Sequence, residues 1–157
     1  MVQRGFTLME MLVVLAIIAI LATMMVPSQG HRNIQTQLVE SVELVDGYKA
    51  AIEAYFRAAG SFPADNEQAG MPAPELLMGN YLQRVDVLDG AMHLMMGNKF
   101  PASLQGSVVS LRPLLVEGSP SSPISWVCGY DEVPEGMKAT ADNRTDLEIK
   151  YLPLRCR

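Results

Sequence analysis

The sequence has few of the residues that mark enzymes, metal sites or nucleic-acid-binding proteins. Charged residues make up 18% of the 157-residue chain, less than the usual quarter, and the net charge is -5. Lys and Arg are scattered singly, without the clusters that neutralise nucleic-acid phosphates. The sequence contains no Gly-rich phosphate loop, no nucleophile elbow and no HExxH zinc motif. These absences argue against an enzyme, and the acidic charge argues against DNA as the main partner.

The isolated residues that could carry chemistry have simpler interpretations. His31 and His93 each stand alone, which is more typical of surface or core histidines than of a ligand or a base. Asp142, Asp146 and Glu148 form a local acidic cluster, but they lack the regular ligand loop and the glycine of a calcium site. A solvated surface is therefore favoured, and we expect no catalytic residue, no metal and no cofactor.

Cysteine is also scarce. Cys128 and Cys156 are the two cysteines of the chain, and neither belongs to a CxxC pair or to a Cys/His cluster with metal spacing. Two such residues would usually be free thiols in a cytosolic protein and a disulfide in an exported one. The choice depends on the compartment, which the N-terminal segment indicates.

One long apolar run lies near the N-terminus. The stretch Phe6 to Val26 has Thr7, Glu10 and Thr23 as its polar side chains. As a helix it would be roughly 31 Å long, close to the thickness of the hydrocarbon core of a bilayer. A buried core helix is rarely this long in so small a domain, and a secretory signal has a shorter apolar region. The sequence therefore predicts a transmembrane helix over residues 6–27.

Two charged residues at the start of this run carry further information. Arg4 lies just before the run, so the positive-inside rule places the N-terminus in the cytoplasm and the rest outside. Glu10 lies inside the run, where a carboxylate costs about 2.5–3.5 kcal/mol on insertion scales. Glu10 could lie near the headgroups, but a positively charged partner in an assembly is the favoured interpretation.

The segment RGFTLME at residues 4–10, with the apolar run that follows, resembles the signature of type IV prepilins. In that family a short basic leader ends in glycine, and a prepilin peptidase cuts after this glycine and N-methylates the new first residue. The resemblance implies a leader at residues 1–5, cleavage between Gly5 and Phe6, and methylation of Phe6. It also implies that Glu10 pairs with the Phe6 ammonium of a neighbouring subunit in the filament core, which would fix the axial register.

The helical pattern continues beyond the apolar run. Pro27 is expected to end or kink the first stretch, because proline lacks an N–H and clashes with the preceding turn. Apolar residues then recur at helical spacing, which predicts an amphipathic half of the helix over residues 28–60 that stops at Gly60. The apolar stripe consists of Ile34, Leu38, Val42, Val45, Ile52, Tyr55 and Phe56. Both halves together predict a helical spine of roughly 80 Å.

The remainder of the chain predicts a head built on a sheet. Residues 61–80 are rich in Pro and Gly and are expected to be a connecting loop with one short helix. Within residues 81–157, strands are predicted at 84–88, 91–96, 107–111 and 124–128. Asp89-Gly90 is a hairpin signal, and Pro113 is expected to stop the third strand. A four-stranded antiparallel sheet packed on the long N-terminal helix makes the fold class α+β.

The segments SWVCG at 125–129 and NRTDL at 143–147, with residues 151–157, are similar to the end of type IVa major-type pilins. The resemblance implies a Cys128–Cys156 disulfide that bounds an exposed C-terminal loop used in subunit contacts or surface binding. Such a crosslink stabilises a fold by roughly 3–4 kcal/mol on the loop-entropy model.

The resemblance thus implies a structural pilus subunit with the pilin roll fold. It would be inserted in the bacterial inner membrane as a prepilin and polymerised into an extracellular filament for adhesion, twitching motility or DNA uptake. Expected partners are other copies of itself in a helical homopolymer, prepilin peptidase, the inner membrane and the pilus assembly platform. Host or abiotic surfaces are further candidates, and DNA is a candidate that the charge does not support. A minor pilin and a type II secretion pseudopilin are the alternatives; the disulfide loop favours a major pilin, because major-type pseudopilins generally lack it.

Overall fold

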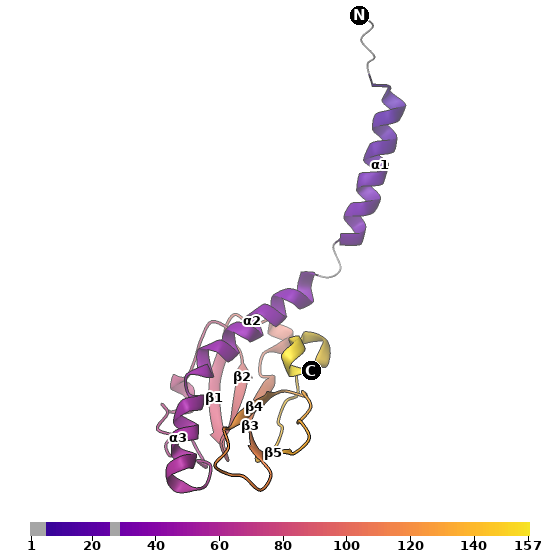
Figure 1. The fold of residues 1–157 in the computed structure, drawn as a ribbon. Coiled ribbons are helices and arrows are strands. Elements are labelled where there is room, and N and C mark those ends of the chain that lie inside the picture. The colour runs from indigo at the N-terminus through magenta and orange to yellow at the C-terminus, as the bar shows by residue number, and fades with distance from the viewer. Residues whose placement is uncertain (1–5, 26–28) are drawn as a thin grey trace, which may run out of the picture.

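The computed structural model describes residues 6–25 and 29–157. Figure 1 shows a helix, α1 (Leu8–Met25), that stands clear of a compact head. In the head, α2 (Gln29–Asp46) and α3 (Lys49–Ala59) lie against an antiparallel sheet. This two-layer arrangement confirms the α+β fold class.

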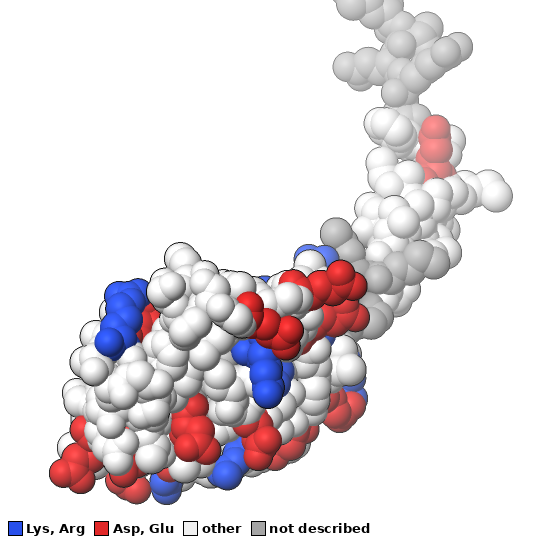
Figure 2. Space-filling model, turned by 60° about the horizontal axis from the view of Figure 1, so that its bottom comes forward, with Lys and Arg blue, Asp and Glu red and all other residues white. Residues whose placement is uncertain are grey.

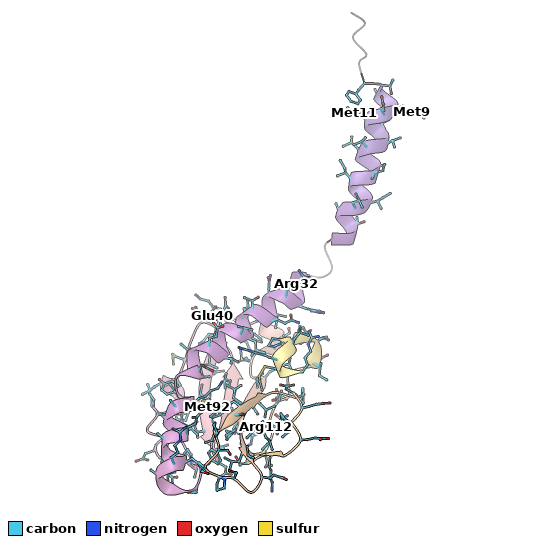
Figure 3. All side chains as sticks on the ribbon, in the orientation of Figure 1. Met9, Met11, Arg32, Glu40, Met92 and Arg112 are labelled. Atoms are coloured by element: carbon cyan, nitrogen blue, oxygen red, sulfur yellow. A yellow bond between two sulfur atoms is a disulfide. The ribbon has the colours of Figure 1, made fainter. Side chains whose placement is uncertain are left out.

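Helix α1 is apolar on every side. Its 18 residues make a helix about 27 Å long, and Glu10 is its charged residue. All side chains from Leu8 to Thr23 are exposed, and Figure 3 shows them pointing outward around the helix, with Met9 and Met11 near its start. Within the described residues, no helix reaches the combination of length and hydropathy that a membrane crossing requires.

The amphipathic part of the predicted spine is interrupted in the structure. The sequence predicts one unbroken helix here, but α2 ends at Asp46, α3 begins at Lys49, and Gly47 and Tyr48 form a turn between them. The prediction is wrong at this point because glycine costs about 1 kcal/mol in a helix interior. The Tyr48 amide donates to the Val45 carbonyl at 3.0 Å, three residues back, which closes a tighter turn than the regular α-helical one.

The end of α3 is as the sequence predicts. Gly60 follows the last helical residue with a φ of 72°, and its amide donates to the Phe56 carbonyl. Glycine adopts this left-handed conformation at little steric cost, which makes it the usual residue after a helix. Pro27, where the sequence predicts an earlier break, lies outside the described residues.

The sheet is a four-stranded meander with one short addition. Its strands are β1 (Leu82–Leu88), β2 (Ala91–Met96), β3 (Val108–Val116), β4 (Ser125–Cys128) and β5 (Met137–Ala139). The order across the sheet is β1-β2-β3-β4, all antiparallel, and β5 pairs with β3. Asp89 and Gly90 have φ values of 48° and 81°, which suit a two-residue hairpin between β1 and β2. The meander and its hairpin are confirmed, while β5 is an element that the sequence interpretation missed.

Strand β3 continues past Pro113, where the sequence predicts its end. Pro113 pairs with Trp126 of β4, and the strand runs on to Val116. Residues of antiparallel strands direct their N–H and C=O to the same side, and the Pro113 carbonyl accepts from the Thr140 amide at 3.4 Å. The ring nitrogen therefore faces the side on which pairing with β2 has already ended at Leu111. The predicted end is wrong because the proline interrupts no ladder there.

One hydrophobic core joins the helices to the inner face of the sheet. The helices contribute Leu38, Val42, Val45, Ile52 and Phe56, all buried members of the predicted apolar stripe. The strands contribute Val85, Val87, Met92, Leu94, Met96, Val109 and Leu111. Figure 3 shows Met92 of β2 between the helices and the sheet. The apolar stripe of the amphipathic segment is therefore the face that packs on the sheet.

The loop between α3 and β1 is fastened along the outer edge of β1. Asn66 is buried, and its Oδ1 accepts from the Val87 amide at 2.7 Å. Its Nδ2 donates to the carbonyls of Val85 at 3.0 Å and Pro72 at 3.2 Å. The side chain thus takes the place of a neighbouring strand at an edge that would otherwise be open. A short 3-10 helix, Pro74–Leu76, follows in the region where one short helix is predicted.

Candidate assembly site

The start of α1 is closed by reciprocal hydrogen bonds between Thr7 and Glu10. The Thr7 hydroxyl accepts from the Glu10 amide at 3.2 Å. The Glu10 carboxylate accepts from the Thr7 amide at 3.3 Å and from the Thr7 hydroxyl at 3.2 Å. This arrangement is a capping box, which satisfies N–H groups that the first turn of a helix leaves free. The Thr-x-x-Glu spacing is visible in the sequence, but the sequence interpretation gives Glu10 only an intermolecular partner.

One oxygen of Glu10 remains available within this arrangement. Both bonds that the carboxylate accepts from Thr7 use Oε2. A carboxylate offers about four acceptor positions on its two oxygens, so Oε1 can accept from an ammonium group without opening the capping box. The negative charge also lies at the N-terminal end of α1, where the helix dipole stabilises it.

The residues predicted for processing lie beside the capping box. Phe6 directly precedes the box, and its side chain is 78% exposed. Gly5 lies outside the described residues. Within one chain, the structure therefore brings Glu10 together with Thr7, and the pairing of Glu10 with the Phe6 amine of a neighbour stays a prediction.

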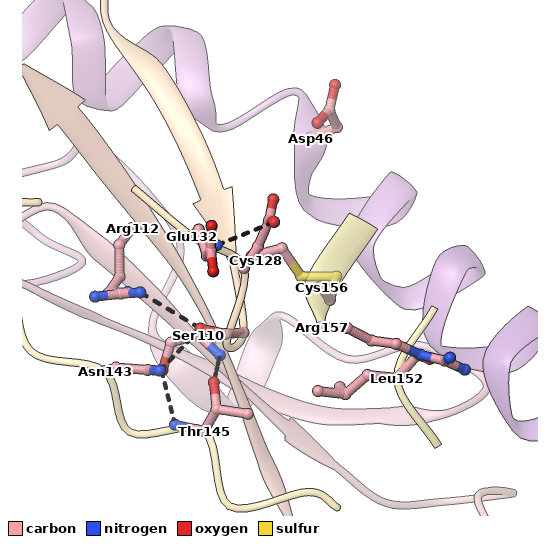
Figure 4. Close-up of a disulfide and its surroundings, with 12 residues drawn as sticks. Asp46, Ser110, Arg112, Cys128, Glu132, Asn143, Thr145, Leu152, Cys156 and Arg157 are labelled. Atoms are coloured by element: carbon pink, nitrogen blue, oxygen red, sulfur yellow. Dashed lines mark hydrogen bonds between the residues drawn. A yellow bond between two sulfur atoms is a disulfide. The ribbon is translucent and has the colours of Figure 1, made fainter. Parts of the chain in front are cut away.

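The two cysteines form the predicted disulfide, whose surroundings Figure 4 shows. The Cα atoms of Cys128 and Cys156 lie 4.5 Å apart across a sequence separation of 28, and both residues are buried. The bond joins the end of β4 to the short 3-10 turn Leu154–Cys156. The Tyr130 amide donates to the Cys156 carbonyl at 3.0 Å. Gly129, with a φ of 58°, passes so close that an added Cβ would lie 2.4 Å from that carbonyl oxygen.

Residues 143–146 form a second attachment, beside the start of β3 (Figure 4). The Ser110 amide donates to Thr145 Oγ1 at 3.0 Å, and the Val108 amide donates to Asp146 Oδ1 at 2.7 Å. The segment thus covers the part of β3 that precedes its pairing with β4. Asp146, predicted to lie on a solvated acidic surface, instead binds backbone, and no hydrophobic periodicity in the sequence signals this attachment.

His93 of β2 lies beneath this attachment and is 5% exposed. Its Nδ1 lies 2.9 Å from Ser110 Oγ, and that oxygen accepts from the Arg144 amide at 2.9 Å. Burial lowers the pKa of His93 below its ordinary value, and the nearby charges of Arg144 and Arg112 lower it further. His93 is thus a core histidine, whereas His31 is exposed and packs edge-on against the ring of Tyr151.

Asp86, His93 and Ser110 lie in register across β1, β2 and β3. Asp, His and Ser are the residue types of a hydrolase triad. Ser110 is fully buried, and its hydroxyl already contacts His93 and the Arg144 amide. The Asp86 carboxylate is bound by the Arg84 guanidinium, with Nε to Oδ2 at 2.9 Å. A nucleophile must reach a substrate atom, and this hydroxyl is enclosed. In this row Ser110 holds the 143–146 segment to the sheet, because its hydroxyl accepts from the Arg144 amide and its amide donates to Thr145 Oγ1.

The charged side chains of the head are dispersed on the face that Figure 2 shows. In the part of the chain that the structure describes, no group of three or more His, Cys, Asp or Glu side chains could hold a metal ion. Lys150 pairs with Glu148 at 2.7 Å. Figure 2 shows Lys and Arg as separate spots among Asp and Glu on the face in view, without a continuous basic patch.

Comparison with known families identifies the class of protein. A family model described as pilin, a bacterial filament protein, matches residues 35–157. The chain belongs to the pilin family. A model of the prokaryotic N-terminal methylation motif matches residues 1–26 of this pilin. Both matches confirm the family that the sequence resembles.

Individual relatives agree along nearly the whole chain. This pilin is 32% identical to a type IV major pilin protein, PilE, of Neisseria gonorrhoeae over 161 residues, which cover 99% of the chain and 94% of the relative. It is 30% identical to a fimbrial protein of Neisseria meningitidis serogroup A, again over 99% of the chain and 94% of the relative. A fimbrial protein of Pseudomonas aeruginosa is 27% identical over 87% of the chain and 91% of the relative.

Proposed function

We propose that this chain is the structural subunit of a type IV pilus. It enters the inner membrane as a prepilin, is cut between Gly5 and Phe6, is methylated on Phe6, and polymerises with other copies of itself into an extracellular filament. The observation that carries the proposal is the combination of an N-terminal methylation motif over residues 1–26 with a pilin head over residues 35–157. The name of the gonococcal relative, a type IV major pilin, supports a major subunit.

In this proposal α1 passes from the bilayer into the core of the filament. The helix exposes apolar side chains on every side, and packing against neighbouring helices replaces their contact with lipid, so they stay out of water in both places. Glu10 then sets the register, because its free Oε1 can accept from the Phe6 ammonium of the neighbouring copy. A misplaced subunit would bury an unpaired charge, and removing one partner of a buried ion pair costs about 3–5 kcal/mol.

Two variants separate the charge of Glu10 from its capping role. Glu10→Gln keeps a side chain that can complete the capping box but removes the charge. Thr7→Ala removes the cap and keeps the charge. We expect both proteins to accumulate in the membrane, with few surface filaments for Glu10→Gln and near-normal numbers for Thr7→Ala, measured by electron microscopy and immunoblots of sheared filaments. Normal filament number and length in Glu10→Gln would refute the registry mechanism.

Mass spectrometry of the filament protein tests processing directly. The mature chain should begin at Phe6 and carry one methyl group on its amine. A filament protein that retains residues 1–5 would contradict the proposed maturation. The alternatives, a minor pilin or a type II secretion pseudopilin, predict that the chain is a trace component of sheared filaments, whereas a major subunit dominates them.

The tasks of the filament follow from its position on the cell surface. Adhesion to host or abiotic surfaces, twitching motility and DNA uptake are the proposed roles. The net charge of -5 gives DNA no electrostatic support from the subunit as a whole. A strain that lacks the chain should lose each activity that depends on the filament, and complementation with the wild-type chain should restore it.

A further inference from the structure

Two exposed surfaces of opposite charge flank α2. The first, here called the acidic groove, lies between α2 and the segment before β1. It is lined by Glu40, Ser41, Glu43, Leu44, Gly79, Asn80, Tyr81 and Leu82. Asn80 Nδ2 donates to Glu40 Oε1 at 3.0 Å and holds that carboxylate at the rim. Leu44 is 54% exposed, and Leu76 and Met78 nearby are also exposed, so the groove has an apolar edge as well as two acidic groups.

The second surface, here called the basic knob, is formed by residues 149–157. Leu154 is 83% exposed, and Arg155 and Arg157, which follow it closely in the sequence, are also exposed. Arg157 uses its Nε to donate to the Leu152 carbonyl at 2.9 Å, which fixes the stem of that side chain. The disulfide at Cys156 anchors the knob to β4. The knob thus presents two exposed arginines, a residue type enriched among the residues that dominate binding at interfaces, together with an exposed leucine.

The groove and the knob lie on opposite sides of the same helix. Gln35 Nε2 donates to the Lys150 carbonyl at 3.2 Å on the side of the knob. Leu44, on the side of the groove, is nine positions further along α2, and nine residues are about two and a half turns of an α-helix. The two side chains therefore point in opposite directions, and one molecule cannot bring its own knob to its own groove.

We propose that the basic knob of one subunit docks into the acidic groove of a second copy of this chain. This contact rests on the proposed function, because it is a contact between heads in the filament. Glu40 and Glu43 face a partner surface that carries Arg155 and Arg157, and the described residues that line the groove include no Lys or Arg. Leu154 lies against the apolar edge at Leu44.

The geometry favours a second copy over any other occupant. A surface that is complementary to a different surface on the same molecule makes heterologous, head-to-tail contacts. Such contacts propagate into open helical assemblies whenever the rotation between subunits does not close a ring. The placement of groove and knob on opposite flanks of α2 supplies this arrangement within one chain, and the pilin family forms filaments of repeated subunits.

A photocrosslinking experiment tests the contact in assembled filaments. A benzophenone amino acid replaces Leu154 in the full-length chain, filaments are sheared and irradiated, and crosslinked peptides are mapped by mass spectrometry. We expect crosslinks between different copies that join position 154 to residues 40–44 or 76–82. Crosslinks that map only to other parts of the chain would overturn the contact while leaving the filament function intact. Failure of the wild-type chain to form filaments would refute the proposed function instead.

Charge reversal gives an independent test with internal rescue. Glu43→Arg and Arg155→Glu should each lower filament yield about fivefold, since a rim charge pair contributes on the order of 1 kcal/mol. The double variant restores opposite charges across every contact and should recover to within about twofold of the wild type. Lys138→Glu on β5 is the matched control and should leave the yield unchanged. Normal yield in both single variants, or no recovery in the double variant, would overturn the proposal.

Discussion

Thr7 determines how the first turn of α1 is completed. Replacing Thr7 with alanine removes the hydroxyl that accepts from the Glu10 amide, and loss of an N-cap side chain costs about 1 kcal/mol. We expect the amides of the first turn to exchange faster in Thr7→Ala, measured by hydrogen exchange of the full-length protein in detergent micelles. Thr7→Ser keeps the hydroxyl and serves as the control. Equal exchange in all three proteins would show that the capping box contributes nothing to helix stability.

His93 makes the stability of the head depend on pH. Burial is the largest cause that lowers its pKa, and the charges of Arg144 and Arg112 act in the same direction, while Asp86 and Asp142 oppose them without reversing the shift. The folded state therefore binds a proton less readily than the unfolded chain, whose histidines titrate near 6.5. The stabilisation is present above about pH 6.5 and is lost as the pH falls from there toward the folded-state pKa.

Chemical denaturation of the wild type and of His93→Gln at several pH values measures this effect. The wild type should have a lower unfolding midpoint at pH 5 than at pH 7.5. The His93→Gln variant should be less stable overall but should lose less on acidification. The same loss in both proteins would assign the pH dependence to other groups.

At the scale of elements, Asn66 connects the loop after α3 to the edge of β1. In Asn66→Ala the Val87 amide and the carbonyls of Val85 and Pro72 lose their side-chain partners. Buried groups left without a partner cost about 1–3 kcal/mol each, although water that enters will reduce the total. We expect a destabilisation of about 2–4 kcal/mol by denaturant titration, with faster proteolysis of the loop. Asn80→Ala, at an exposed loop position, should change the unfolding midpoint little, and an equal effect of both substitutions would contradict the role of Asn66.

The elements that the sequence predicts well are those with local causes. The apolar stripe of α2 and α3, the stop at Gly60 and the Asp89-Gly90 hairpin each follow from spacing or from glycine conformation in a few consecutive residues. The continuation of β3 through Pro113 could not be predicted, because it depends on where β2 ends in space. The 143–146 attachment is invisible for a similar reason: its bonds join side chains to the backbone of a distant strand.

Some features of the candidate sites likewise follow from local sequence, and others depend on how distant segments meet in the fold. The Thr7–Glu10 capping box could have been read from its spacing, since both partners lie within one helical turn. The disulfide is implied by family resemblance, while Ser110 as a partner of His93 emerges only when β2 and β3 are in register. The groove and knob are surface features that require the positions of both flanks of α2, which no local pattern encodes.

At the scale of the whole molecule, the disulfide holds the last part of the chain to the sheet. Replacing Cys128 and Cys156 together with serine should lower the free energy of unfolding by roughly 3–4 kcal/mol on the loop-entropy model. Denaturant titration under oxidising conditions measures this loss, and limited proteolysis should cut between the two positions first. Reduced wild-type protein is the matched control and should behave like the double variant. A double variant as stable as the oxidised wild type would show that the attachment at 143–146 suffices alone.

The unlike flanks of α2 also give any row of these heads a direction. At one end of the row the last acidic groove is empty, and at the other end the last basic knob is uncovered. Machinery that adds or removes subunits can therefore distinguish the two ends by charge, without contacting the buried helices. A related protein with only one of the two surfaces would join at a single end and stop growth there, and so act as a terminator for that end.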